Sequence, residues 1–162
     1  MGDIAPTLRF RAFSDDDLSV LGPWLLQAGL GVPAGVSREQ LGRRLREDAH
    51  IVCRTALGNR HSVVGFFRLD LAPDNTAELT LIVAPRLRRC GIGRYLIESA
   101  LHEARRLGLK GLVGVIQDAN QCAIRLFLDA GFDVGSRVLA GYQVLQRMVH
   151  RADHKPPIEV VP

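Results

Sequence analysis

Arg88, Gly91 and Gly93 form an R-x-x-G-x-G loop directly between an apolar run and a helical pattern. Glycines carry no side chain, so successive backbone N–H groups can face one concavity, and the first turn of the following helix adds the positive end of its dipole. Arg89 and Arg94 add positive charge at the rim. The segment therefore predicts a strand, an anion-binding loop and a helix in direct succession.

The glycine loop does not fit two well-known nucleotide-binding motifs. Leu96 occupies the third position of a dinucleotide fingerprint, where glycine or alanine is needed for close packing of the helix on the strand. The acidic ribose ligand expected about 20 residues further on is missing, and the sequence has no GxxxxGK[ST] motif. Two glycines after a strand are also compatible with a plain tight turn, so the loop alone does not identify its ligand.

Hydrophobic periodicity and turn residues predict the elements around the loop. Strands are expected at 7–13, 50–55, 62–71, 76–84, 111–116, 132–139 and 142–149, and helices at 15–27, 37–49, 93–107 and 120–130. The helix between the fourth and fifth strands predicts a right-handed crossover with parallel pairing. The fold class is therefore α/β (α+β), with a mixed, mostly antiparallel sheet of about seven strands flanked by about four helices, in the order β-α-α-β-β-β-α-β-α-β-β.

The chain has 162 residues, of which 47% are hydrophobic and 23% charged, enough to bury a core without disulfides. We expect one domain over residues 1–150 and a polar tail over 151–162. The cysteines are odd in number and form no CxxC pair, which favours a reducing compartment and a cytoplasmic location. Residues 18–36 are uncharged, but prolines and glycines interrupt them, so we expect a short helix and a loop rather than a membrane span.

A formal net charge of +4 and a pI near 9.4 suit an anionic partner. Much of the positive charge is arginine, in pairs that are also typical of solvated helix faces. No aromatic platform or recognisable DNA- or RNA-binding motif accompanies the arginines, so we expect no nucleic-acid partner.

A second motif, N-x-x-A-x-x-x-F-x-x-x-G-F, extends from Asn120 to Phe132. With this motif following the glycine loop, residues 76–132 resemble the GNAT superfamily of N-acetyltransferases. The resemblance implies a GNAT-like sheet, acetyl-CoA as co-substrate without a metal, and direct transfer of the acetyl group to a primary amine.

The resemblance also implies where acetyl-CoA lies. The loop would hold the pyrophosphate, and the fourth strand would pair with the pantetheine arm where it splays from the fifth strand. A backbone N–H near Val83 would stabilise the oxyanion. The implied cofactor-binding residues are Leu81, Ile82, Val83, Arg88, Arg89, Cys90, Gly91, Ile92, Gly93, Arg94, Asn120 and Phe127. The side chain of Asn120 also fits a helix N-cap, and the two roles are compatible.

Glu78 is the candidate general base, because it lies in an otherwise apolar strand that enters the cofactor site. The alternative is that Glu78 is an outward-facing surface carboxylate without a catalytic role. Phe127 occupies the position where many family members have a tyrosine acid, and a phenyl ring cannot donate a proton. The acid would then be Tyr142 or water, or none would be needed. Cys122 has no evident histidine partner, so an acyl-cysteine mechanism is not expected.

Two functions remain open: an acetyltransferase, or a non-catalytic CoA-binding sensor or interaction module, which the loss of the tyrosine at Phe127 would suit. The resemblance places the acceptor walls in the first two helices with their loop and in the hairpin at 137–142. A small molecule or a peptide could supply the amine: a protein N-terminus, lysine, polyamine, antibiotic or amino acid. The apolar segment around Trp24 would suit a hydrophobic acceptor or the second copy of a homodimer.

Overall fold

The computed structural model describes residues 7–27 and 37–149. The strands are β1 (Arg9–Ala12), β2 (Ile51–Leu57), β3 (Val63–Leu71), β4 (Thr76–Val83), β5 (Gly111–Gln117), β6 (Asp133–Val134) and β7 (Tyr142–Met148). The helices are α1 (Leu18–Gln27), α2 (Arg38–Glu47), α3 (Ile92–Arg106) and α4 (Gln121–Asp129), with short 3-10 turns η1 (Asp15–Asp17), η2 (Asn59–His61) and η3 (Pro85–Leu87). The predicted order of strands and helices is confirmed.

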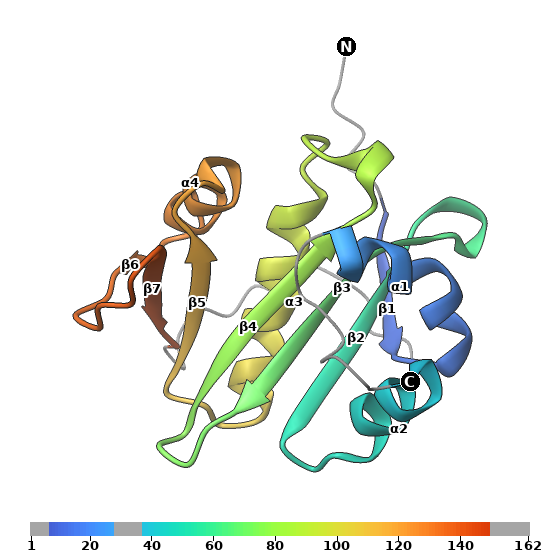
Figure 1. Ribbon diagram of the computed structural model, residues 1–162, viewed down its shortest axis with the longest axis horizontal. Helices are drawn as coiled ribbons and strands as arrows, with labels where there is room; N and C mark the ends of the chain where they lie inside the picture. Colours follow the sequence, from blue (N-terminus) through green and yellow to red (C-terminus); the bar gives the residue numbers. More distant parts are fainter. Residues whose placement is uncertain (1–6, 28–36, 150–162) are drawn as a thin grey trace.

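The strands form one open, seven-stranded sheet in the order β1-β2-β3-β4-β5-β7-β6 (Figure 1). Among the described strands, β4 and β5 form the one parallel pair, and α3 makes the crossover between them. The remaining neighbours are antiparallel. The expected mixed, mostly antiparallel sheet is therefore confirmed.

Each face of the sheet carries its own hydrophobic cluster, as the alternation of strand side chains requires. On β3, Phe67 joins the cluster beneath α3 and α4, whereas its neighbour Phe66 joins the cluster beneath α1 and α2. Figure 1 shows α1 and α2 on one side of the sheet and α3 on the other. Trp24, on α1, packs against the second cluster.

The sheet divides between β4 and β5. The two strands pair only from Thr76 with Gly111 to Glu78 with Val113, and beyond these residues they diverge (Figure 1). On its other side, β4 stays in unbroken register with β3 as far as Val83. The carboxyl-terminal half of β4 therefore has an open edge, as the family resemblance implies.

The last hairpin is shorter than the sequence predicts. The pattern at 132–139 indicates a full strand, but β6 comprises only two residues. Phe132 is buried in the core just before the strand, and after it the N–H of Gly135 donates to the carbonyl of Val144 at 2.8 Å. A Cβ at Gly135 would lie 3.1 Å from that carbonyl oxygen, so glycine permits a close approach that ends the regular ladder.

A buried carboxylate links β1, η1 and β2. Asp17 lies at the end of η1, directly before α1, and is only 2% exposed. Its oxygens accept hydrogen bonds from Arg11, from the N–H of Ser14 and from the hydroxyl of Thr55. Burial raises the pKa of Asp17, but these hydrogen bonds outweigh the effect and hold the pKa below its ordinary value.

Two sequence expectations concern residues outside those described. These are the loop part of the uncharged segment, 28–36, and the tail, 151–162. Within the described residues, no helix has both the length and the apolar character required to span a membrane.

Candidate active site

The glycine loop connects β4 to α3 with two residues in the left-handed region. Gly91, the N-cap of α3, has φ of +80°, and Arg89 has φ of +64°. Among the described residues, no acceptor pairs with the backbone N–H groups from Arg88 to Gly93. The loop therefore presents a run of free donors at the positive end of a 15-residue helix, an arrangement that suits an anion.

Arginine side chains surround these donors. Arg88 and Arg89 are exposed and form no ion pair with a described residue. Arg94 is exposed as well, and its Nε lies 3.2 Å from Glu98 one turn along α3. Cys90, also exposed, makes only a weak contact of 3.6 Å from its Sγ to the carbonyl of Arg88. The rim of the loop is therefore positively charged and accessible.

The open edge of β4 presents the backbone groups of alternate residues. The N–H of Ala84 donates to β3, and on the opposite side the carbonyl of Asn75 accepts from the N–H of Lys110. Strand alternation then directs the C=O of Leu79 and the N–H and C=O groups of Leu81 and Val83 toward β5, beyond the last pair of β4 with β5. The edge from Leu79 to Val83 is about 13 Å long at roughly 3.3 Å per residue.

Of the three β4 residues predicted to bind the cofactor, Leu81 and Val83 fit this edge. The backbone of Ile82 pairs with Phe66 of β3, and its side chain is buried against the cluster beneath α1. Leu81 and Val83 can therefore pair through their backbone with a ligand at the open edge, and Ile82 cannot.

Asn120 lies just beyond the carboxyl end of β5, at the same open end of the split as the glycine loop. Its side-chain oxygen accepts a hydrogen bond of 3.2 Å from the N–H of Ala123, so the predicted N-cap role is confirmed. The side chain is exposed. Its role in contacting a cofactor stays a prediction.

Phe127 is 3% exposed and lies edge-on to Phe132, with ring centroids 4.9 Å apart. The ring packs on Gly114 of β5, where a Cβ would lie 2.5 Å from the ring atom Cε1. The phenyl ring offers no donor, so a proton for a leaving group must come from another residue or from water.

The two predicted catalytic side chains, Glu78 and Tyr142, share one face of the sheet but lie apart. Glu78 is exposed at the last paired position of β4 with β5, and it has no ion pair with a described residue. Tyr142 is 40% exposed and pairs with Gln117 at the far end of β5. The strand partners of these two residues, Val113 and Gln117, are four positions apart, which is about 13 Å along β5.

Two charged residues beside Glu78 were missed by the sequence analysis. Asp70 lies directly opposite Glu78 on β3, and its Oδ2 accepts a hydrogen bond of 2.8 Å from Nε of Arg68. Both side chains are about one-third exposed. The signal was the alternation of Arg68 and Asp70 with apolar residues in β3, which places the two charges on one face.

The cysteines do not form a nucleophilic site. Cys53 is buried, and burial raises the pKa of its thiol to about 12. Cys90 and Cys122 are exposed. No described histidine forms a hydrogen bond with any of the three.

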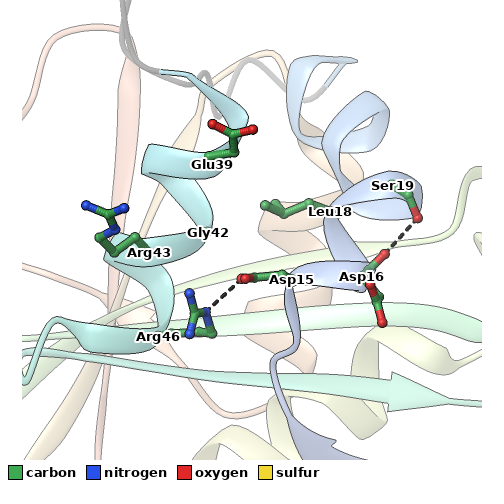
Figure 2. A pocket seen from close by; sticks show the side chains of 8 residues that line it. All are labelled: Asp15, Asp16, Leu18, Ser19, Glu39, Gly42, Arg43 and Arg46. Atoms are coloured by element: carbon green, nitrogen blue, oxygen red, sulfur yellow. Dashed lines mark hydrogen bonds and ion pairs between the residues drawn. The ribbon is translucent and has the colours of Figure 1, made fainter.

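A surface groove of about 800 Å³ lies between α2 and the η1–α1 segment (Figure 2). Within it Nε of Arg46 lies 2.7 Å from Asp15, and Gly42 allows the helices to approach closely. The groove is lined by Asp15, Asp16, Leu18, Ser19, Glu39, Gly42, Arg43 and Arg46. None of these residues belongs to β4, β5 or the glycine loop, so the groove is separate from the split in the sheet.

A family model described as the acetyltransferase (GNAT) family matches residues 24–132, which is more than half of the chain. A Bacillus subtilis (strain 168) protein, YwnH, provisionally named a phosphinothricin acetyltransferase, is 34% identical over 61 residues. That alignment spans 38% of this chain and 37% of the relative. The chain therefore matches little more than a third of the curated relative's length.

Solved structures match nearly the whole fold. A spermidine N-acetyltransferase from Vibrio cholerae, in complex with CoA and spermine, has a TM-score of 0.76 at 18% identity, covering 88% of this chain and 96% of that one. The PaiA N-acetyltransferase from Thermoplasma acidophilum, in complex with coenzyme A, has a TM-score of 0.73 at 19% identity, covering 88% and 99%. At these identities the similarity shows the fold.

Proposed function

The chain belongs to the acetyltransferase (GNAT) family, and we propose that it transfers the acetyl group of acetyl-CoA directly onto a primary amine. The main support is that two features lie next to each other at the open end of the split. A loop with free N–H donors and a positive rim lies where β4 ends, and the unpaired edge of β4 leads from that loop into the sheet. This combination suits an anionic head group followed by a long amide-containing arm.

In this proposal the residues from Arg88 to Gly93 bind the pyrophosphate through their backbone, with arginines at the rim supplying charge. Leu81 and Val83 pair with the amides of the pantetheine arm, as an added strand pairs with a sheet edge. The similar Vibrio cholerae and Thermoplasma acidophilum structures are both complexes with CoA, which agrees with this choice of co-substrate. Asn120 contributes from the β5 side of the split.

The chemistry follows from the residues at the closed end of the split. The amine nitrogen forms a bond to the thioester carbon, and the carbon–sulfur bond breaks as CoA leaves. A free N–H of the β4 edge stabilises the oxyanion. Glu78 accepts the proton that the amine loses, directly or through water. Water supplies a proton to the thiolate, since Tyr142 lies toward the other end of β5.

The acceptor enters, in this proposal, from the face that carries Glu78, Asp70 and Arg68. Glu78 has no ion pair with a described residue, and the three side chains together carry a net negative charge, which favours an acceptor that carries positive charge. The solved relatives include spermidine N-acetyltransferases, whereas the partial relative is named for phosphinothricin, an amino-acid-like amine. Polyamines and amino-acid amines therefore come first among acceptors to test.

The experiment measures CoA binding by calorimetry and acetyl-CoA turnover by chromatographic detection of released CoA. The amine panel holds spermidine, spermine, phosphinothricin, lysine and a peptide with a free N-terminus. We expect CoA release that depends on one class of amine. A chain that does not bind CoA would refute the proposed site, and the Arg88→Ala, Arg89→Ala double variant serves as a weakened-binding control.

The burial of Phe127 and its lack of a donor also support a second candidate, a non-catalytic CoA-binding module. This alternative predicts CoA binding without CoA release on any amine in the panel. The function would then be to bind a peptide or protein partner with an affinity that changes when CoA is bound.

A further inference from the structure

Two consecutive residues of α4 pack onto glycines in different parts of the candidate site. A Cβ at Gly93, in the first turn of α3, would lie 2.7 Å from Cδ2 of Leu126. A Cβ at Gly114, on β5, would lie 2.5 Å from Cε1 and 2.8 Å from Cδ1 of Phe127. Real Cβ atoms essentially never come this close to another heavy atom, so a side chain at either glycine would force its neighbour on α4 to shift.

The position of Gly114 connects this packing to the split in the sheet. Gly114 is the first residue of β5 after Val113, the last residue that pairs with β4. The register of β4 with β3 is unbroken, and so is the register of β5 with β7. The divergence therefore does not arise from a bulge in either strand, and side-chain packing must hold β5 where it is.

The two contacts differ in stiffness. The Leu126 atoms nearest Gly93 are the end of a flexible side chain, whereas the Phe127 ring is a rigid disc, buried at 3% exposure and held edge-on by Phe132. A methyl group at Gly114 would meet three atoms of the ring within 3.3 Å. The ring and β5 therefore cannot both keep their places if Gly114 gains a side chain.

We propose that Phe127 is a positioning residue that holds β5, and with it one side of the CoA cleft, in line with the glycine loop. Leu126 fixes α4 to the first turn of α3 at Gly93, and Phe127 fixes the same helix to β5 at Gly114. The second glycine of the loop motif thus serves helix packing. The inference rests on the proposed function, because it assigns the cleft between β4 and β5 to CoA.

The test is a double-mutant cycle on CoA affinity, with Gly114→Ala, Phe127→Leu and the double variant. We expect Gly114→Ala to weaken CoA binding by about tenfold, and Phe127→Leu in the same chain to restore most of that loss, because the smaller side chain makes room for the methyl group. Affinity is measured by calorimetry with CoA at 25 °C, and circular dichroism verifies that every variant is folded.

A matched control separates positioning from simple loss of stability. Phe10, on β1, is buried to 1% in the same cluster and makes its own ring contact with Phe67 at 6.2 Å, far from the split along the sheet. Phe10→Leu should lower the melting temperature as Phe127→Leu does, yet leave the Kd for CoA within about twofold of wild type. Of these two leucine variants, only Phe127→Leu should weaken CoA binding.

The outcomes distinguish the two proposals. If the wild-type chain does not bind CoA, the proposed function fails and the positioning role fails with it. If wild type binds CoA but Gly114→Ala is not rescued by Phe127→Leu, or Phe10→Leu weakens binding as much as Phe127→Leu, only the positioning role is overturned. Rescue together with a silent Phe10→Leu supports it.

Discussion

Arg11 and Asp17 are joined by two parallel hydrogen bonds, of 2.8 Å from Nη1 to Oδ2 and 2.6 Å from Nη2 to Oδ1. This bidentate pair anchors the start of α1 to β1. The same carboxylate also reaches β2 through the hydroxyl of Thr55, at 2.7 Å. One side chain therefore ties together three segments that the sequence separates by as many as 38 residues.

Asp17 makes the stability of the fold sensitive to acid. Its folded pKa lies below the ordinary value, so the unfolded chain binds the proton more readily. The stabilisation is complete above the unfolded pKa of about 3.9 and is lost as the pH falls through the lower folded value. Asp17→Asn should therefore be less stable than wild type at pH 7, and the gap should narrow below about pH 4.

The measurement is urea unfolding at a series of pH values from neutral to acidic. Asp16→Asn is the matched control, because Asp16 is exposed on the adjacent position. A constant difference between wild type and Asp17→Asn at every pH would contradict the assignment.

Glu103 forms ion pairs with two arginines and should contribute more to the free energy of unfolding than a surface ion pair on the same helix. Its side chain is 6% exposed and accepts hydrogen bonds from Arg54 of β2, at 2.7 Å, and from Arg106, at 2.6 Å. Glu103→Gln should cost about 2–4 kcal/mol in the free energy of unfolding, because Arg54 loses its charged partner in a part-buried site. Glu98→Gln, which removes the exposed pair with Arg94, should cost about 0.3–0.5 kcal/mol. Equal costs in urea unfolding would show that burial does not strengthen the Glu103 cluster.

Glu78→Gln should reduce acetyl transfer and leave CoA binding intact. Removal of a general base typically lowers the rate by about 10² to 10⁴, so we expect a loss in kcat of at least about 10² with an unchanged Kd for CoA. The control is Asp70→Asn, which alters the carboxylate directly opposite and should cost less than about tenfold. If Asp70→Asn proves the more damaging change, Asp70 is the better candidate for the base.

Thiol labelling reports on the loop directly. Cys90 and Cys122 are exposed and should react with a thiol reagent at pH 8, whereas burial and a pKa raised to about 12 should leave Cys53 unreactive until the chain unfolds. In a Cys122→Ser chain, Cys90 is then the single fast thiol, and saturating CoA should slow its labelling. Equal labelling rates with and without CoA would place the ligand elsewhere.

The sequence predicted the elements well because their signals are local. Strand alternation, the glycine at the start of α3 and the capping box from Ser37 to Gln40 at the start of α2 each depend on a few neighbouring residues. The exception was the strand at 132–139. There Phe132 belongs to the core and Gly135 meets the backbone of β7, and both facts depend on residues distant in the sequence.

The candidate site was predictable only where its chemistry is written in one segment. The free donors and the positive-φ glycine of the loop follow from the R-x-x-G-x-G pattern. That Leu81 and Val83, but not Ile82, face the open edge depends on which side β3 occupies. The packing of Gly93 on Leu126 likewise joins two motifs that the sequence presents as independent.

The three-residue pairing of β4 with β5 has a consequence for how the molecule is held together. Within the described part of the chain, Thr76 to Glu78 form the only ladder between a four-stranded and a three-stranded half of the sheet. Main-chain hydrogen bonds therefore make each half a cooperative unit, but the joint between the halves depends on the side chains of α3 and α4. In amide hydrogen exchange the two halves should open with different free energies. A ligand bound in the split would contact both halves, and the two should then open together with one free energy.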